Sequence, residues 1–218
     1  MERFFIFDDK NTWYDWELIL TSKTITPPEP KTNYISIDGM SGTLDLSEAL
    51  TGETTYNDRK ISAIFWTSEG SHKDREKLIR EITTFLHGKK VKIIEPDDTD
   101  HYFYGRVKIA SVINNLAYAE ISLECDCEPW RYSINESVRV VTAAPQELTN
   151  VIINNGGVKT LTPVISVEGD IDIIYNNQNY SLTEGIYKIP DVKLYQGVNI
   201  IGVTGGGSVT FSYREAEL

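Results

Sequence analysis

The chain has 218 residues, of which 40% are hydrophobic and 11% aromatic, enough to build one large or two modest buried cores. Lysine and arginine number 21 against 32 aspartates and glutamates, and the net charge of −11 opposes binding to phosphate backbones and anionic lipids. No basic stripe is present, so the sequence predicts no sequence-specific nucleic-acid partner.

The amino-terminal residues do not have the pattern of a secretion signal. Only four consecutive apolar residues, Phe4 to Phe7, precede the charged residue Asp8, whereas a signal peptide needs a core of about seven or more. No later apolar run approaches the ~18 residues of a membrane helix. We therefore expect a soluble protein that is made in the cytoplasm and does not insert into a membrane.

The first half of the chain predicts several strands. Residues 34–37 and 61–66 are rich in β-branched and aromatic side chains and lie on either side of a segment with several glycines. Residues 91–94 and 102–109 predict a hairpin around a polar turn, and residues 117–125 predict a further strand.

One helix is predicted among these strands. Ser71 and Asp74 have the spacing of a capping box, and Gly88 favours a left-handed helix stop. The sequence therefore predicts a helix over about residues 72–87. Its apolar stripe, at helical spacing, is expected to cover a sheet and consists of Leu78, Ile79, Ile82, Phe85 and Leu86.

A domain boundary is expected after Glu128, because the rest of the chain shows closely spaced short strands and no helical window. The predicted fold class is mainly β. Residues 1–128 are expected to form a β-sandwich that carries the helix and a β-hairpin, and residues 129–218 a second β-sandwich or jelly roll.

Two turns are expected in the second domain. Residues 176–179 form a polar stretch between two apolar runs, which predicts a four-residue hairpin loop. Residues 205–208 are rich in glycine but lack the lysine and the following helix of a phosphate-binding loop, so we interpret them as another hairpin turn.

No group of residues predicts a catalytic or metal site. The densest set of possible metal ligands lacks the glycine and the terminal glutamate of a calcium loop, and we interpret it as an ordinary turn. That set is Asp97, Asp98, Asp100 and His101. Asp45 and Glu48 could act as an acid–base pair only in a cleft that raises one pKa, and their sequence surroundings predict instead a tight loop whose backbone donors they satisfy.

The two cysteines, Cys125 and Cys127, lie two residues apart in a predicted strand. A disulfide between such near neighbours would be strained, and the sequence offers no second cysteine pair for zinc. We therefore expect two reduced, buried thiols. The sequence predicts no cofactor, no metal and no enzymatic activity.

Residues 38–52 read DGMSGTLDLSEALTG, and residues 56–59 follow as YNDR. This order resembles the signature of the distal tail proteins of long, non-contractile bacteriophage tails. Later segments resemble the same family at residues 125–132, 155–157 and 197–211, so the resemblance covers nearly the whole chain. The positions that match the opening motif are Gly39, Gly42, Leu44, Asp45, Leu46, Glu48, Leu50, Gly52, Tyr56 and Arg59.

The resemblance implies a structural protein of the phage tail tip. In this family the amino-terminal domain forms a hexameric ring, and a galectin-like domain lies at its periphery. The implied partners are other copies of the chain, the tail tube protein, the tape-measure protein and the tail-associated lysin or baseplate hub. The implied location is the tip of the virion tail, after assembly in the cytoplasm of the bacterial host.

Two alternatives stay open at this point. A galectin-like domain with many aromatic residues is also compatible with an adhesion module that binds host cell-wall saccharides. The same tail parts also occur in tail-derived particles that deliver no DNA.

Overall fold

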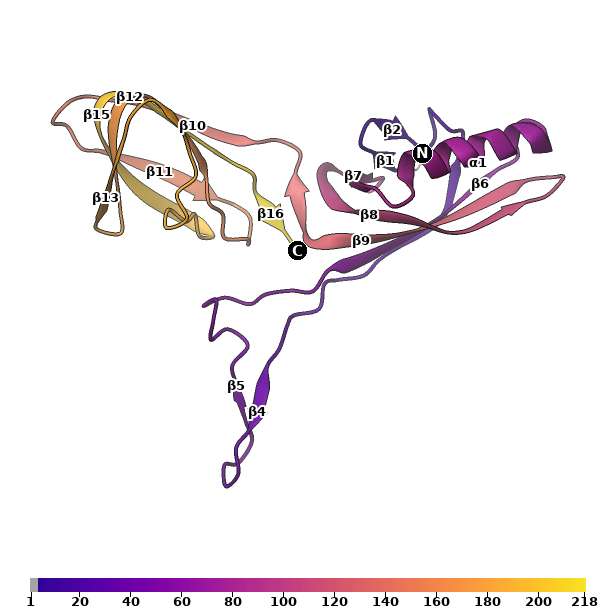
Figure 1. Cartoon of the computed structure of the whole chain (residues 1–218), viewed down its shortest axis with the longest axis horizontal. Coiled ribbons are helices and arrows are strands. Elements are labelled where there is room, and N and C mark those ends of the chain that lie inside the picture. Colours follow the sequence, from indigo (N-terminus) through magenta and orange to yellow (C-terminus); the bar gives the residue numbers. More distant parts are fainter. Residues whose placement is uncertain (1–3) are drawn as a thin grey trace. The chain divides into compact units, whose positions relative to one another are not determined.

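The computed structural model describes residues 4–218, which form two compact units (Figure 1). The first unit ends at Arg131 and also includes Leu218, and the second runs from Tyr132 to Glu217. The division between the units thus lies inside strand β9 (Ala119–Ser133). The same strand continues through Glu128, after which the domain boundary was predicted. Strands dominate both units, which confirms the mainly β fold class. No helix in the described residues has the length and apolar character of a membrane span.

The first unit is built on one sheet with the strand order β2-β1-β7-β8-β9-β6-β3. Its strands, besides β9, are β1 (Ile6–Phe7), β2 (Lys10–Asn11), β3 (Ile19–Ile25), β6 (Arg59–Thr67), β7 (Lys90–Glu95) and β8 (Asp98–Asn114). Strand β6 pairs antiparallel with both β3 and β9. Its side chains alternate between buried and more exposed positions, as expected for a strand with one face on a core.

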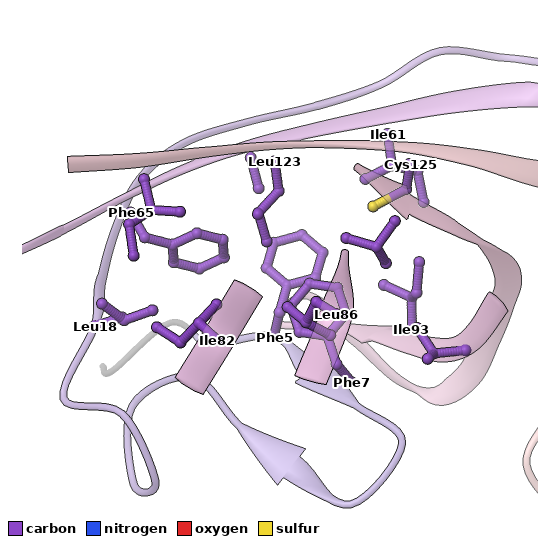
Figure 2. Close-up of a cluster of buried hydrophobic side chains, with 14 of the residues drawn as sticks. Phe5, Phe7, Leu18, Ile61, Phe65, Ile82, Leu86, Ile93, Leu123 and Cys125 are labelled. Atoms are coloured by element: carbon purple, nitrogen blue, oxygen red, sulfur yellow. The ribbon is translucent and has the colours of Figure 1, made fainter. Parts of the chain in front are cut away.

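The core of the first unit lies between this sheet and the elements that cover it. Figure 2 shows Phe65 and Leu123 directed from the sheet toward Phe5, Ile82 and Leu86. All five side chains are buried. Full burial of such side chains contributes roughly 1.5–3 kcal/mol each, so this cluster is the main source of stability for the unit.

Helix α1 (His72–Leu86) begins with the predicted capping box: Ser71 Oγ accepts a hydrogen bond from the backbone N–H of Asp74, and the Asp74 carboxylate accepts one from the backbone N–H of Ser71. Ile82 and Leu86 are buried. Phe85 is only half-buried and meets the edge of Trp16, with 5.6 Å between ring centroids. The helix is confirmed, and the buried residues of its predicted stripe are Ile82 and Leu86, three residues before and one residue after Phe85.

The second unit is a sheet with the order β10-β15-β12-β13, in which β11 also pairs with β15 and β14 with β12. The strands are β10 (Ser137–Ala143), β11 (Thr149–Asn155), β12 (Val164–Tyr175), β13 (Gln178–Leu182), β14 (Gly185–Tyr187) and β15 (Gly197–Tyr213). Strand β16 (Ala216–Glu217) is not part of this sheet and pairs with β9. The long strand β15 pairs first with β11 and then with β10. Buried side chains of these strands include Val151, Ile165, Ile173, Ile201, Val209 and Phe211.

The glycine run at residues 205–207 is not a hairpin turn, and this prediction was wrong. These residues lie in the middle of β15, paired with residues 169–171 of β12. A Cβ atom at Gly207 would lie 2.0 Å from the backbone oxygen of Glu168, and one at Gly205 would lie 2.3 Å from that of Asp170. Glycine is present because the two strands approach too closely for a side chain.

The hairpin between β12 and β13 is tighter than predicted. Tyr175 pairs with Gln178, so only Asn176 and Asn177 form the loop. Their φ angles are +48° and +63°, the left-handed values that a two-residue turn of this hairpin type requires. Asparagine accepts this conformation more readily than most residues.

Candidate assembly site

The motif segment forms a separate hairpin between β3 and β6. Its strands, β4 (Tyr34–Ser36) and β5 (Thr43–Asp45), pair only with each other, in a two-stranded sheet (Figure 1). We call residues 31–54 the arm. Within the arm only Leu46 and Ser47 are even partly buried. A two-stranded hairpin without a packed face is marginally stable in water.

The arm exposes an unusual number of large apolar side chains. Leu50 is fully exposed at 101% of its reference area, and five others are between 40% and 57% exposed. Those five are Tyr34, Ile35, Ile37, Met40 and Leu44. Isolated exposed apolar residues are normal, but a group of six on one short hairpin marks a surface that another molecule covers.

The glycines of the motif shape the turns of the arm. Gly39, Gly42 and Gly52 have φ angles of +84°, +86° and +73°, which a residue with a side chain adopts only at a cost. No atom lies within 4 Å of a Cβ built at any of them. The need for glycine at these positions therefore comes from backbone conformation and not from crowding.

Polar residues of the motif hold the loop after β5. The carboxylate of Asp45 accepts hydrogen bonds from the backbone N–H of Ser47, at 2.9 Å, and from its hydroxyl, and these bonds lower the pKa of Asp45. Ser47 Oγ in turn accepts from the backbone N–H of Asn33 at 2.9 Å. Glu48 accepts from the hydroxyl of Thr54 at 2.6 Å, so its carboxylate bonds a side chain and not the predicted backbone donor. Asp45 and Glu48 thus tie the arm together, and both carboxylates lie on its exposed surface.

Tyr56 and Arg59 anchor the base of the arm to β9. Tyr56 packs edge-on against Trp130 with 5.5 Å between ring centroids. Arg59 Nε donates to the carbonyl oxygen of Pro129 at 2.8 Å, and its guanidinium lies 5.0 Å from the ring centroid of Phe103. The end of the opening motif and the 125–132 segment, separated by about 70 residues, therefore meet in one place.

The anchor is buried. Arg59 is only 5% exposed, and burial lowers its pKa. It pairs in register with Cys127, whose pKa burial raises to about 12. Cys125 is also buried and free, as expected. A buried guanidinium bonded to a carbonyl and stacked on an aromatic ring gives the arm a fixed root.

The remaining motif leucines do not form a cluster. Leu44 and Leu50 are exposed and Leu46 is half-buried. The exposure of Tyr34, Ile35 and Ile37 was not predicted, because an alternating apolar run is typical of a strand on a core. Nothing in the sequence signals that this strand has no sheet to pack on.

Of the acidic set predicted as a turn, only Asp97 lies in the turn, because Asp98, Asp100 and His101 are part of β8. Asp97 forms an ion pair with Lys23 at 2.7 Å, while Asp98 contacts His101 Nδ1 at 3.0 Å and Arg131 at 3.2 Å. Among residues 4–218, no group of three or more histidine, cysteine or acidic side chains has the geometry to hold a metal ion.

The profile of the phage tail protein RIFT-related domain family matches residues 14–127. Among solved structures, the Dit (gp 19.1) protein of SPP1 has a similar fold, with a TM-score of 0.71 over 97% of this chain and 98% of that one, at 13% sequence identity. That protein is described as a paradigm of the hub adsorption apparatus in phages that infect Gram-positive bacteria. No curated protein matches the chain significantly.

Proposed function

The chain belongs to the phage tail proteins with a RIFT-related domain, and we propose that it is a distal tail protein whose copies close into a hexameric ring at the tail tip. The ring is the hub that joins the tail tube to the tail-tip adsorption apparatus. The role is structural and involves no catalytic step. The virion tail tip is its final location, after assembly in the cytoplasm of the host.

The observation that carries this proposal is the exposed apolar arm. In this proposal the arm of one copy packs on a different surface of the next copy, so the contact between copies is heterologous. Such contacts repeat from one copy to the next and generate a ring when the rotation closes. Five of the six side chains are about half exposed and Leu50 is fully exposed. Covering them stabilises each contact by roughly 1 kcal/mol for each half-exposed side chain and by more for Leu50.

The anchor at the base of the arm supports the same role. Arg59 and Tyr56 fix the root of the arm on β9, so the direction in which the arm leaves the sheet is set before any partner binds. A rigid root lowers the entropic cost of association. The positive-φ glycines of the arm, Gly39, Gly42 and Gly52, likewise shape its turns before any partner binds.

The experiment compares two single substitutions of fully or largely exposed aliphatic residues. Leu50→Asp changes the arm, and Ile186→Asp, at a side chain that is 77% exposed on β14, is the matched control. Each variant is examined by size-exclusion chromatography with light scattering, and its melting temperature is recorded. We expect Leu50→Asp to weaken assembly at least ~10-fold at unchanged melting temperature, while the control assembles normally.

If the two variants assembled equally well, the arm would not be the contact that holds the ring together. The other partners of the hub are the tail tube protein, the tape-measure protein and the tail-associated lysin or baseplate hub, and co-purification of tagged protein with assembled tails tests them. A chain that stays monomeric with every partner, and that binds purified host cell-wall polysaccharide saturably, would instead be an adhesion module.

A further inference from the structure

Strand β11 lies at an edge of the sheet in the second unit. It pairs with β15 along its whole length, from Thr149 to Asn155, and with no other described strand. Among the described residues, one further bond reaches its backbone: the hydroxyl of Tyr213 donates to the carbonyl oxygen of Asn154 at 2.8 Å. An edge strand presents a row of N–H and C=O groups that can pair with another strand. The outer side of β11 is therefore an open row of backbone groups.

The other two edge strands of seven residues carry features that hinder such pairing. Strand β3 includes Lys23 and has a register shift between Leu20 and Ser22. Strand β10 includes Arg139. Charged side chains and bulges of this kind discourage the addition of a further strand. Residues 148–158, by contrast, contain no charged side chain, in a chain that is 24% charged. The edge of β11 is therefore unprotected.

An exposed apolar row leads up to this edge. Ile152 of β11 lies directly opposite Ile200 of β15, and the two side chains are 60% and 58% exposed. Val198 lies two residues before Ile200, on the same face of β15, and is 69% exposed. Side chains that lie opposite each other on neighbouring strands stabilise a sheet. A strand added beside β11 would place a side chain next to Ile152 and continue this row.

We propose that an extended segment of a different tail-tip polypeptide adds to β11 as a further strand. The main-chain hydrogen bonds of the edge supply affinity in this mode of recognition. Ile152 favours an uncharged, β-branched side chain beside it. A charged segment fits less well, because residues 148–158 offer no charge of either sign to pair with it. The partner is thus recognised as an extended, uncharged chain.

The choice of a different polypeptide over a second copy rests on the proposed ring. Two β11 edges would pair antiparallel about a two-fold axis, which is an isologous contact. Neighbouring copies in a closed ring meet through heterologous contacts, so their β11 strands do not face each other in this way. Pairing of β11 with β3 or β10 of a neighbour is hindered by Lys23 and Arg139.

The first test measures binding of a synthetic strand to the full chain. The probe is a fluorescein-labelled peptide of alternating threonine and valine. The control is the same peptide with N-methylated central amides, which keeps the side chains but cannot pair as a strand. We expect saturable binding of the probe by fluorescence anisotropy and no binding of the control. Bound probe should slow hydrogen exchange in peptides from β11 and leave peptides from β10 unchanged.

Two substitutions separate binding at the edge from binding on the face of the sheet. Ile152→Lys and Ile200→Lys place the same charge on two opposite and equally exposed isoleucines, but only Ile152 lies beside an added strand. Probe binding should weaken roughly 5-fold or more in Ile152→Lys and less than about 2-fold in Ile200→Lys. The melting temperature and the mass of the assembly should equal the wild-type values in both variants, because both side chains are exposed.

The assembled tail tip tests the source of the strand. With p-benzoylphenylalanine in place of Ile152, we expect a photo-cross-link to a polypeptide of different mass. A cross-link to a second copy, or no cross-linked product, would overturn the proposal. Equal loss of probe binding in the two lysine variants, or equal binding of the probe and its N-methylated control, would also overturn it. Probe binding at β11 by a chain that forms no ring would support the strand site and contradict the ring, so the two proposals fail separately.

Discussion

Two neighbouring glycines of β15 allow a sharp test of the close approach between β12 and β15. An alanine Cβ at position 207 would lie 2.0 Å from the backbone oxygen of Glu168, and backbone cannot move aside as a flexible side chain can. At position 206 the nearest atom to such a Cβ is Cγ of Pro145, at 3.7 Å, which is an ordinary contact. Gly207→Ala and Gly206→Ala are therefore matched in chemistry and opposite in expected effect.

The size of the effect follows from the clash. Relief of a 2.0 Å contact requires the strands to separate by about 1 Å, and overpacking of this kind costs roughly 2–3 kcal/mol. Gly206→Ala should be neutral or stabilise the protein by roughly 0.5 kcal/mol, because it reduces the conformational freedom of the unfolded chain.

Hydrogen exchange of the full chain, followed by mass spectrometry, measures the loss of stability around β12 and β15. A loss of about 2 kcal/mol corresponds to roughly 30-fold faster exchange in peptides from β12 and β15. Peptides from α1 in the first unit serve as the internal reference. Wild-type exchange in Gly207→Ala, or equal acceleration in both variants, would refute the account of the glycine run.

Four further predictions concern the first unit. Ile82→Ala, at a buried position of α1, should lower the free energy of unfolding by roughly 2–4 kcal/mol, measured by tryptophan fluorescence. The exposed change Lys77→Ala should stay within about 0.5 kcal/mol of wild type. Equal effects of the two changes would show that the helix packs on a different face. Ser71→Ala should destabilise the protein by about 1 kcal/mol through loss of the cap. Hydrogen bonds from Ser71 lower the pKa of Asp74 from 3.8. The stabilisation by Asp74 is therefore fully present above pH ~4 and is lost as the pH falls through the lowered folded-state pKa. A difference in unfolding free energy between wild type and Asp74→Asn that grows on acidification would contradict this. Burial raises the pKa of Cys127 to about 12. Cys127 should therefore react with a thiol reagent at pH 8 only after the protein unfolds. Rapid reaction of the native protein would show that the anchor of the arm is open to solvent.

The helix could be predicted from the sequence because its signals are local. Ser71, Asp74 and Gly88 lie within one segment, and the apolar stripe between them has a single consistent period. The same local reasoning failed at residues 205–207, since glycine serves equally in a turn and in a close approach of two strands. Only the partner strand β12, about 35 residues earlier, distinguishes the two cases.

The candidate site was partly predictable. The motif gave the turns of the arm, because positive φ at Gly39 and Gly42 is a property of the residues themselves. The exposure of Ile35 and Ile37 could not be predicted, since burial depends on whether another layer packs on the strand. The contact of Arg59 with Pro129 joins two motifs that local patterns cannot bring together. The hollow lined by Trp13, Tyr14 and Glu69 likewise assembles from the segments on either side of the arm.

The most direct test of the ring is native mass spectrometry of the full chain, alone and with a tail partner. The account predicts a closed particle of about six times 24.7 kDa, which dissociates when Leu50 is changed to aspartate. A chain that remains at 24.7 kDa in every condition, or an open series of masses without a closed end point, would contradict it.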